Sequence, residues 1–161
     1  MNRSVALVLA LVLALAGCRS APQETGGPVA DSAADALEPA PDLAASEASL
    51  KTGTWHWVGT NRPADRVEPD DPAKYTIAFQ GDSTVHVKAD CNSGSGSYFL
   101  IEGQRLQIGP VTSTLMGCPT GSYDTEFNRE LGEVEGWSVS GDTLSFSLKL
   151  GQGTMRFVRR G

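Results

Sequence analysis

The chain has 161 residues, of which 40% are hydrophobic and 7% aromatic, and its 13 basic and 19 acidic side chains give a formal net charge of −6. No basic stripe runs through the sequence, and Arg159 and Arg160 form only a pair at its end. Nucleic-acid binding depends on neutralising phosphates, so the composition argues against a nucleic-acid partner. The negative charge favours solubility.

The first 17 residues have the pattern of a secretory signal. Arg3 supplies a positive charge, and an unbroken apolar stretch follows over residues 5–17. A membrane-spanning helix needs about 20 apolar residues, which is longer than this stretch, and a signal ends in small residues as this one does. The four residues from Leu15 to Cys18, at the end of this segment and just beyond it, resemble a bacterial lipobox. The resemblance implies that the signal peptide covers residues 1–17 and that Cys18 becomes a lipidated N-terminus.

The lipobox resemblance also predicts a location in the cell envelope. It implies acyl chains on Cys18, palmitate among them, and several such chains hold a protein permanently at a membrane. Arg19 follows the cysteine, where an aspartate would indicate retention in the inner membrane. We therefore expect a lipoprotein of the outer membrane that faces the periplasm.

Residues 18–52 are predicted to form a disordered tether behind the lipid anchor. They are mostly Ala, Pro, Ser, Gly and scattered acids, with no aromatic residue. Such a composition buries too little apolar surface to offset the entropy of ordering. Asp31 to Leu37 and Leu43 to Leu50 are the alternatives for short amphipathic turns, but their leucines are too few for a packed face. The prediction for this stretch is a tether.

Residues 53–161 are predicted to form one domain that is rich in antiparallel strands. Short segments alternate between apolar and polar residues, and glycine-containing turns separate them, which is typical of hairpins. The region has a common domain size, with room for one core. The predicted strands cover residues 54–58, 74–79, 84–89, 97–101, 105–108, 137–140, 143–148 and 154–159.

One segment departs from the strand pattern and predicts a helix between residues 122 and 135. Its apolar residues recur at spacings of three and four, which places them on one helical face. Ser122 is suited to cap the helix, and Gly136 is suited to end it. A helix packed on a curved antiparallel sheet makes the predicted fold α+β. The apolar stripe consists of Tyr123, Phe127, Leu131 and Val134.

Two cysteine-centred motifs carry a resemblance to a known family. The first is Asp90-Cys91-Asn92 with Gly96 beyond it, and the second runs from Thr114 through Met116 to Cys118. In this order they resemble the META domain family, which includes the HslJ-like envelope lipoproteins. The resemblance implies a curved antiparallel half-barrel of about seven to eight strands with one helix, and it brings no catalytic residues. Leu115 stands where the family often has a basic residue.

Cys91 and Cys118 remain as an even pair once Cys18 is lipidated. Thiols oxidise in the envelope, so the prediction is a disulfide between them. Zinc is the alternative, with His56 and His86 as further ligands, but structural zinc sites have tightly spaced ligands and these are scattered. His86 stands between Val85 and Val87 in a predicted strand and is expected to point to solvent. We expect no metal and no cofactor.

One polar pair and one aromatic pair of residues could either contact a ligand or stabilise the fold. Asp90 and Asn92 lie beside the run from Ser93 to Ser97, which could bring the backbone close to a ligand. The favoured interpretation is a flexible hairpin loop in which they bond local amides. Trp55 and Trp57 share one face of a strand, where they either line a groove or fill the core.

The sequence therefore predicts a non-enzymatic envelope lipoprotein. Its domain would bind a partner or support envelope assembly or the response to envelope stress. The alternative is a carrier of a small ligand or lipid inside the half-barrel, by analogy with secretin pilot proteins. The expected partners are the membrane, through the lipid, and an unidentified envelope protein or small ligand, and the expected state is a monomer. A filled interior would favour the first function, and an open interior the second.

Overall fold

The computed structural model describes residues 42–160. The predicted signal peptide, Cys18 and most of the predicted tether lie outside the described residues. The described part contains two helices, α1 (Leu43–Leu50) and α2 (Asp124–Gly132), and two short 3-10 turns, Pro72–Lys74 and Lys149–Gly151. The strands are β1 (Thr54–Asn61), β2 (Arg66–Val67), β3 (Tyr75–Phe79), β4 (Thr84–Ala89), β5 (Asn92–Ile101), β6 (Arg105–Ile108), β7 (Thr112–Ser113), β8 (Val134–Ser140), β9 (Thr143–Leu148) and β10 (Thr154–Arg160).

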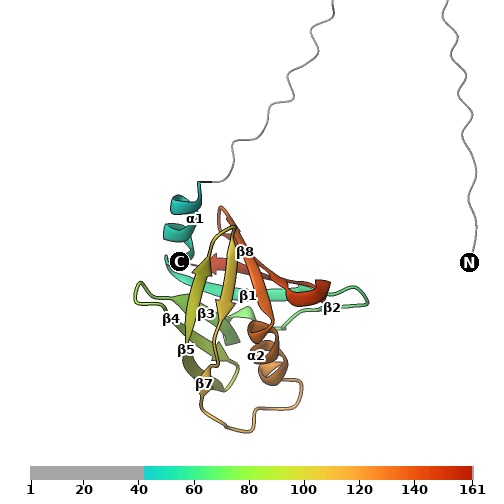
Figure 1. Ribbon diagram of the computed structural model, residues 1–161. Coiled ribbons are helices and arrows are strands. Elements are labelled where there is room, and N and C mark those ends of the chain that lie inside the picture. Colours follow the sequence, from blue (N-terminus) through green and yellow to red (C-terminus); the bar gives the residue numbers. More distant parts are fainter. Residues whose placement is uncertain (1–41, 161) are drawn as a thin grey trace, which may run out of the picture. The chain divides into compact units, whose positions relative to one another are not determined.

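The sheet closes on itself, so the predicted half-barrel is wrong in this respect. All pairings are antiparallel, in the order β10-β9-β8-β6-β5-β4-β3-β1-β2, and β10 also pairs with β1. The last pairing runs from Thr54 with Arg160 to Asn61 with Thr154 and joins the two ends of the sheet. With the short strands β2 and β7 set aside, the result is a closed barrel of 8 strands (Figure 1). The class remains α+β, with a barrel and two helices.

The barrel wall is thinnest between β6 and β8. Their ladder consists of the single pair Arg105 with Gly136, supported by the amide of Trp137, which donates to the carbonyl oxygen of Gln104 at 2.9 Å. Every other neighbouring pair around the barrel has at least two paired residues. One edge of β6 therefore has hardly any strand partner.

The barrel interior is filled by its own side chains. Trp55 and Trp57 both point inward from β1 and are fully buried, so they belong to the core and line no groove. Aromatic rings pack edge to face across the interior, as between Phe79 and Tyr98, whose centroids lie 4.9 Å apart. Other fully buried side chains are Ile77, Phe127, Leu131, Leu144, Phe146, Met155 and Phe157.

Helix α2 closes one end of the barrel, as its apolar stripe predicts (Figure 1). Phe127 and Leu131 are fully buried, and the Phe127 ring lies 5.2 Å from that of Trp57. The helix is shorter than predicted, because it ends at Gly132 and Val134 already opens β8. Tyr123 occupies the N-cap position, while the hydroxyl of Ser122 accepts from the amide of Asp124 at 3.2 Å.

Helix α1 corrects the prediction of a tether up to residue 52. Asp42 caps it through two amides of its first turn, and Leu50 at its end is fully buried. The indole nitrogen of Trp55 donates to the carbonyl oxygen of Leu50 at 2.9 Å, which joins the helix to the core. The ordered domain thus begins before residue 53. Neither helix of the described part is long and apolar enough to cross a membrane.

The run from Ser93 to Ser97 belongs to β5 and is not the flexible loop that we predicted. It pairs with β4 over its whole length, while β7 pairs with Gly94 and Ser95. A side chain at Gly94 would collide with the backbone of Thr112, and one at Gly96 would lie 2.9 Å from the carbonyl oxygen of Pro110. These glycines let the segment after β6 lie directly against β5.

Candidate functional site

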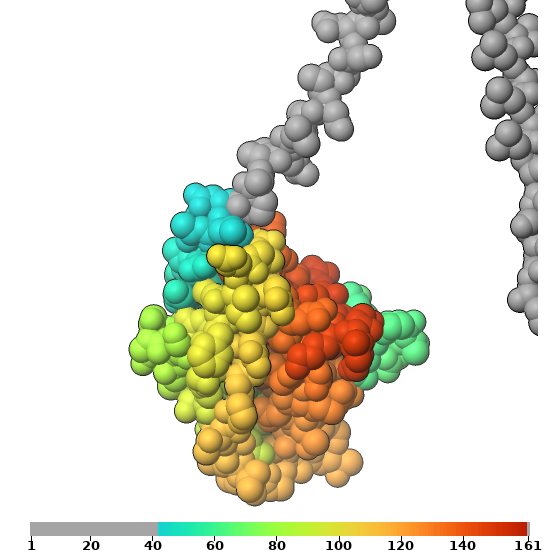
Figure 2. All heavy atoms as spheres, in the orientation of Figure 1, coloured from blue at the N-terminus to red at the C-terminus, as the bar shows by residue number. Residues whose placement is uncertain are grey.

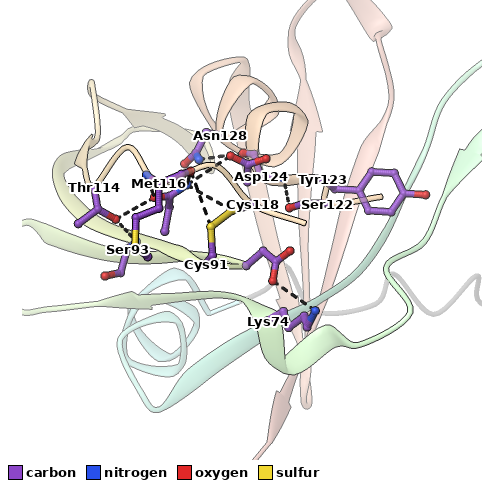
Figure 3. Close-up of a disulfide and its surroundings, with 12 residues drawn as sticks. Lys74, Cys91, Ser93, Thr114, Met116, Cys118, Ser122, Tyr123, Asp124 and Asn128 are labelled. Carbon is purple, nitrogen blue, oxygen red and sulfur yellow. Dashed lines mark hydrogen bonds and ion pairs between the residues drawn. A yellow bond between two sulfur atoms is a disulfide. The ribbon is translucent and has the colours of Figure 1, made fainter. Parts of the chain in front are cut away.

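The two cysteine-centred motifs meet at the α2 end of the barrel, where the predicted disulfide is present. Cys91 lies in the turn between β4 and β5, and Cys118 lies in the segment before α2, with their α-carbons 5.6 Å apart (Figure 3). The bond occupies both thiols, so the zinc alternative loses two of its ligands. His86 is exposed on β4 as predicted, and His56 is partly buried on β1. Burial lowers the pKa of His56, with help from the charge of Arg160.

Asn92 is the centre of a hydrogen-bond network that links the two motifs. Its side-chain oxygen accepts from the hydroxyl of Thr114 at 2.9 Å and from the amide of Met116 at 2.8 Å. Its nitrogen donates to the Met116 carbonyl oxygen at 3.0 Å and lies 3.4 Å from both Cys118 Sγ and Asp124 Oδ2. The side chain is 5% exposed. Asn92 therefore holds two distant segments together, where we predicted a bond to local amides.

Asp90 lies at the tip of the β4–β5 turn with a φ of 54°, a backbone conformation that aspartate adopts more readily than most residues. Its amide donates to the carbonyl oxygen of Lys74 at 2.7 Å, and its carboxylate lies 3.3 Å from the Lys74 ammonium group. A hydrogen bond from Ser122 and the charge of Lys74 lower the pKa of Asp90. Asp90 lies in a turn as predicted, but its carboxylate contacts Lys74, where we predicted a bond to local amides.

A buried ion pair at the same end was missed by the sequence analysis. Glu130 on α2 is 1% exposed and accepts from the guanidinium of Arg62 at 2.6 Å and from the hydroxyl of Thr60 at 2.6 Å. Arg62 also contacts Glu126 at 2.5 Å. Burial opposes the charge on Arg62, but the two carboxylates raise the pKa of its guanidinium above the ordinary value. Glu126 and Glu130 are one helical turn apart, which was the available signal.

These polar groups bond to one another within the fold. Glu130 pairs with Arg62, and the side chain of Asn92 forms several hydrogen bonds within the fold. Among residues 42–160 no group of three or more His, Cys, Asp or Glu side chains could hold a metal ion. The arrangement fixes the α2 end of the barrel.

A surface hollow beside this network is the strongest candidate for a binding site. It has a volume of about 480 Å³ and lies between the segment over residues 108–115 and helix α2 (Figure 2). Leu115 at its rim is 97% exposed, and the neighbouring Met116 is 57% exposed. We call this hollow the α2 groove. Its lining residues are Asn92, Ile108, Gly109, Pro110, Val111, Ser113, Thr114, Leu115, Asp124, Thr125, Asn128 and Gly132.

The α2 groove differs from the other large hollow of the surface. That hollow has a volume of about 570 Å³ and lies over the thin part of the wall, beside Gln104, Arg105 and Trp137. Serines and a threonine of β8, β9 and β10 form its floor. It presents no exposed large apolar side chain, whereas the α2 groove is bordered by Leu115 and by both family motifs.

Comparison with known proteins identifies the fold and the family. The META domain model matches residues 48–161. A crystal structure of a DUF4847 family protein from Bacteroides vulgatus ATCC 8482 is similar with a TM-score of 0.55 and 17% identity, covering 71% of this chain and 96% of that chain. A second similar chain, from an NMR structure, has a TM-score of 0.52 and 17% identity, covering 70% of this chain and 92% of that chain.

No curated protein matches the sequence. The two similar structures are distant in sequence and support the barrel fold alone. The family match covers the whole barrel and both cysteine-centred motifs. This chain is a member of the META domain family.

Proposed function

We propose that this protein is a lipid-anchored lipoprotein of the bacterial outer membrane, whose META domain is a non-catalytic binding module facing the periplasm. The observation that carries the proposal is the filled barrel. Its interior holds a continuous apolar core, and helix α2 closes one end with Phe127 and Leu131. Any partner must therefore bind on the surface.

The lipid anchor rests on the sequence before the described domain. The apolar stretch over residues 5–17 and the lipobox-like ending at Cys18 are its basis. The disulfide between Cys91 and Cys118 is consistent with an oxidising compartment, because such bonds are rare in the cytosol. We propose that residues 18–41 connect the anchor to helix α1.

The filled interior also argues against the carrier alternative. A carrier needs a cavity that encloses most of its ligand, typically of 300 Å³ or more. Six large residues occupy the centre of this barrel and are less than 2% exposed: Trp55, Trp57, Phe79, Phe127, Phe146 and Phe157. A lipid or a small ligand could enter only if several of them moved.

Labelling and fractionation would test the anchor. Cells that express the full chain are grown with radioactive palmitate, and their membranes are separated by density. We expect label on the parent protein in the outer-membrane fraction, and neither label nor membrane retention for Cys18→Ser. A Cys18→Ser protein that stays in the membrane as fully as the parent would contradict the anchor.

The non-catalytic part of the proposal needs a separate test. The purified protein is incubated with a panel of ester, peptide, phosphate and glycoside substrates. We expect no turnover above that of a heat-unfolded control. Turnover that Asp90→Ala or Glu130→Gln removes, with an unchanged unfolding midpoint, would show that one of the groups we consider structural is catalytic.

A further inference from the structure

We propose that the α2 groove binds an extended polypeptide segment of a partner protein that carries a Lys or Arg side chain next to an apolar one. The inference rests on the proposed binding function and names the class of partner. Three features of the groove support it: a free strand edge, an apolar wall with an exposed leucine, and hydrogen-bond acceptors without a cation.

The free strand edge belongs to β6. On one side β6 pairs with β5 over all four of its residues, and on the other side it pairs with β8 only at Arg105. Within the described residues, the edge beyond Arg105 has no strand partner, and its last residue, Ile108, lines the groove. Unpaired amides and carbonyls at a sheet edge form hydrogen bonds with the backbone of an added strand. This feature favours a polypeptide over a compact small molecule.

The apolar wall supplies places for side chains of the added segment. Pro110 and Val111 line the groove, and Leu115 stands at its rim. Leu115 is 97% exposed, although burying a leucine side chain stabilises a protein or a complex. Leu115 therefore offers an apolar contact that the fold itself does not use.

The charge of the groove selects a cationic partner. The carboxylate of Asp124 lines the groove, and no ion pair within residues 42–160 includes it. Asn128, one turn along α2, uses its side-chain nitrogen to donate to the Asp124 carbonyl oxygen at 2.8 Å. Its side-chain oxygen is buried and has no hydrogen-bond partner. No Lys or Arg lines the groove, so the fold supplies no cation to the Asp124 carboxylate, whose Oδ2 accepts a hydrogen bond from Asn92 at 3.4 Å.

The position of the groove suits a partner in the periplasm. Helices α1 and α2 lie at opposite ends of the barrel (Figure 1), and α1 is the first element of the described part. The groove lies against α2 and so at the end of the barrel opposite to α1. The hollow is also held in place, because the disulfide and Asn92 fix the segment that forms one of its walls.

A matched pair of peptides tests the proposal. The probes are the acetylated amides of Val-Lys-Val-Lys-Leu and Val-Glu-Val-Glu-Leu, titrated separately into isotope-labelled protein covering residues 18–161 with Cys18→Ser. Amide resonances are followed by two-dimensional NMR. We expect the lysine peptide to shift resonances of residues 106–115 and 124–132, and the glutamate peptide to bind at least tenfold more weakly.

Two variants, each with a matched control, locate the binding. Asp124→Asn should weaken the lysine peptide about fivefold, the effect of one partly exposed ion pair, while Asp142→Asn, at a side chain that is 80% exposed, should not. Leu115→Ala should weaken both peptides, while Leu150→Ala, at a side chain that is 91% exposed, should have no effect. Leu115 is so exposed that its replacement leaves the fold intact, which keeps the test valid if Asp124→Asn disturbs α2.

The possible failures have different meanings. Equal affinity for the two peptides within the groove would overturn the charge preference and leave the binding function standing. Shifts confined to other surfaces, or none at millimolar peptide, would overturn the α2 groove as the binding site. Neither result affects the palmitate labelling, which tests the anchor independently.

Discussion

A helix lies at each end of the barrel, but the two helices are held in different ways. At the α2 end, the helix buries Phe127 and Leu131, a disulfide joins the neighbouring loops, and Glu130 pairs with Arg62. At the α1 end, the helix buries Leu50 alone and is attached through backbone carbonyls and Ser49. One end combines covalent, apolar and charged contacts, whereas the other depends on one leucine and a few hydrogen bonds.

The difference indicates where rigidity is needed. The α2 end carries both family motifs and the α2 groove, and a groove keeps its affinity when its walls are preorganised. The α1 end carries the junction with residues 18–41. The stabilities of variants at the two ends would measure this contrast.

Phe127→Ala should produce the largest loss of stability. The side chain is fully buried between Trp57, Tyr75 and Phe157, so its truncation leaves a cavity at the α2 end. We expect a loss of about 3–5 kcal/mol in the free energy of unfolding, measured by urea titration. The control is Phe99→Ala, at a side chain that is 54% exposed. An unchanged midpoint for Phe127→Ala would mean that α2 is peripheral.

Removal of the disulfide should have the next largest effect. The bond links Cys91 to Cys118 across a sequence separation of 27, and closing a loop of this size stabilises a fold by about 3–4 kcal/mol in the chain-entropy model. The double variant Cys91→Ala with Cys118→Ala should lose that amount in a urea titration. Reductant should lower the midpoint of the parent and leave the double variant unchanged. A parent insensitive to reductant would contradict the prediction.

Leu50→Ala should lower the free energy of unfolding by less than Phe127→Ala does, because the α1 end is held by fewer contacts than the α2 end. Leu50 is fully buried, but α1 can shift to fill part of the cavity, so we expect about 2–3 kcal/mol, the low end for a buried leucine. Leu43→Ala on the same helix is the control, because that side chain is 46% exposed. A loss as large as that of Phe127→Ala would show that the two ends are equally well held.

Asp90→Asn should have the smallest effect on stability, and that effect should disappear in acid. A hydrogen bond from Ser122 and the charge of Lys74 lower the pKa of Asp90 in the folded state. A lowered folded pKa stabilises the protein above the ordinary value of about 4, and this contribution is lost as the pH falls through the folded pKa. Parent and variant should therefore converge in stability below that value and differ above it. A difference that grows toward lower pH would contradict the assignment.

The sequence was most informative where local pattern decides the structure. Alternation predicted the strands around Val85 and Val87, and the stripe at Phe127 and Leu131 predicted the helix that closes the barrel. The disulfide was predicted from an even pair of cysteines and from the oxidising compartment that the signal-like N-terminus predicts. The residues that determine the strands and the helix are close in sequence, and Cys91 had only Cys118 as a predicted disulfide partner.

The errors arose where distant contacts override local pattern. Leu43 to Leu50 is a weak helix by composition, yet Leu50 and Trp55 hold it to the barrel. The run Ser93 to Ser97 is typical of a loop, yet its glycines permit close contact with residues 110–113. Closure of the barrel by β1 and β10 and burial of Glu130 by Arg62 are set by partners far along the chain. The α2 groove has the same origin, because its walls meet only in the folded protein.

Because β1 pairs with β10, the barrel closes only when the seven residues of β10 are in place. The ribosome synthesises β1 first among the strands. Strand β10 pairs with both β1 and β9, and these pairings form only after β10 has been synthesised. Until then β1 and β9 present open edges, which are templates for aggregation. A nascent chain that stalls before Thr154, or a protein clipped in the turn at residues 149–153, should therefore be a substrate for chaperones and proteases.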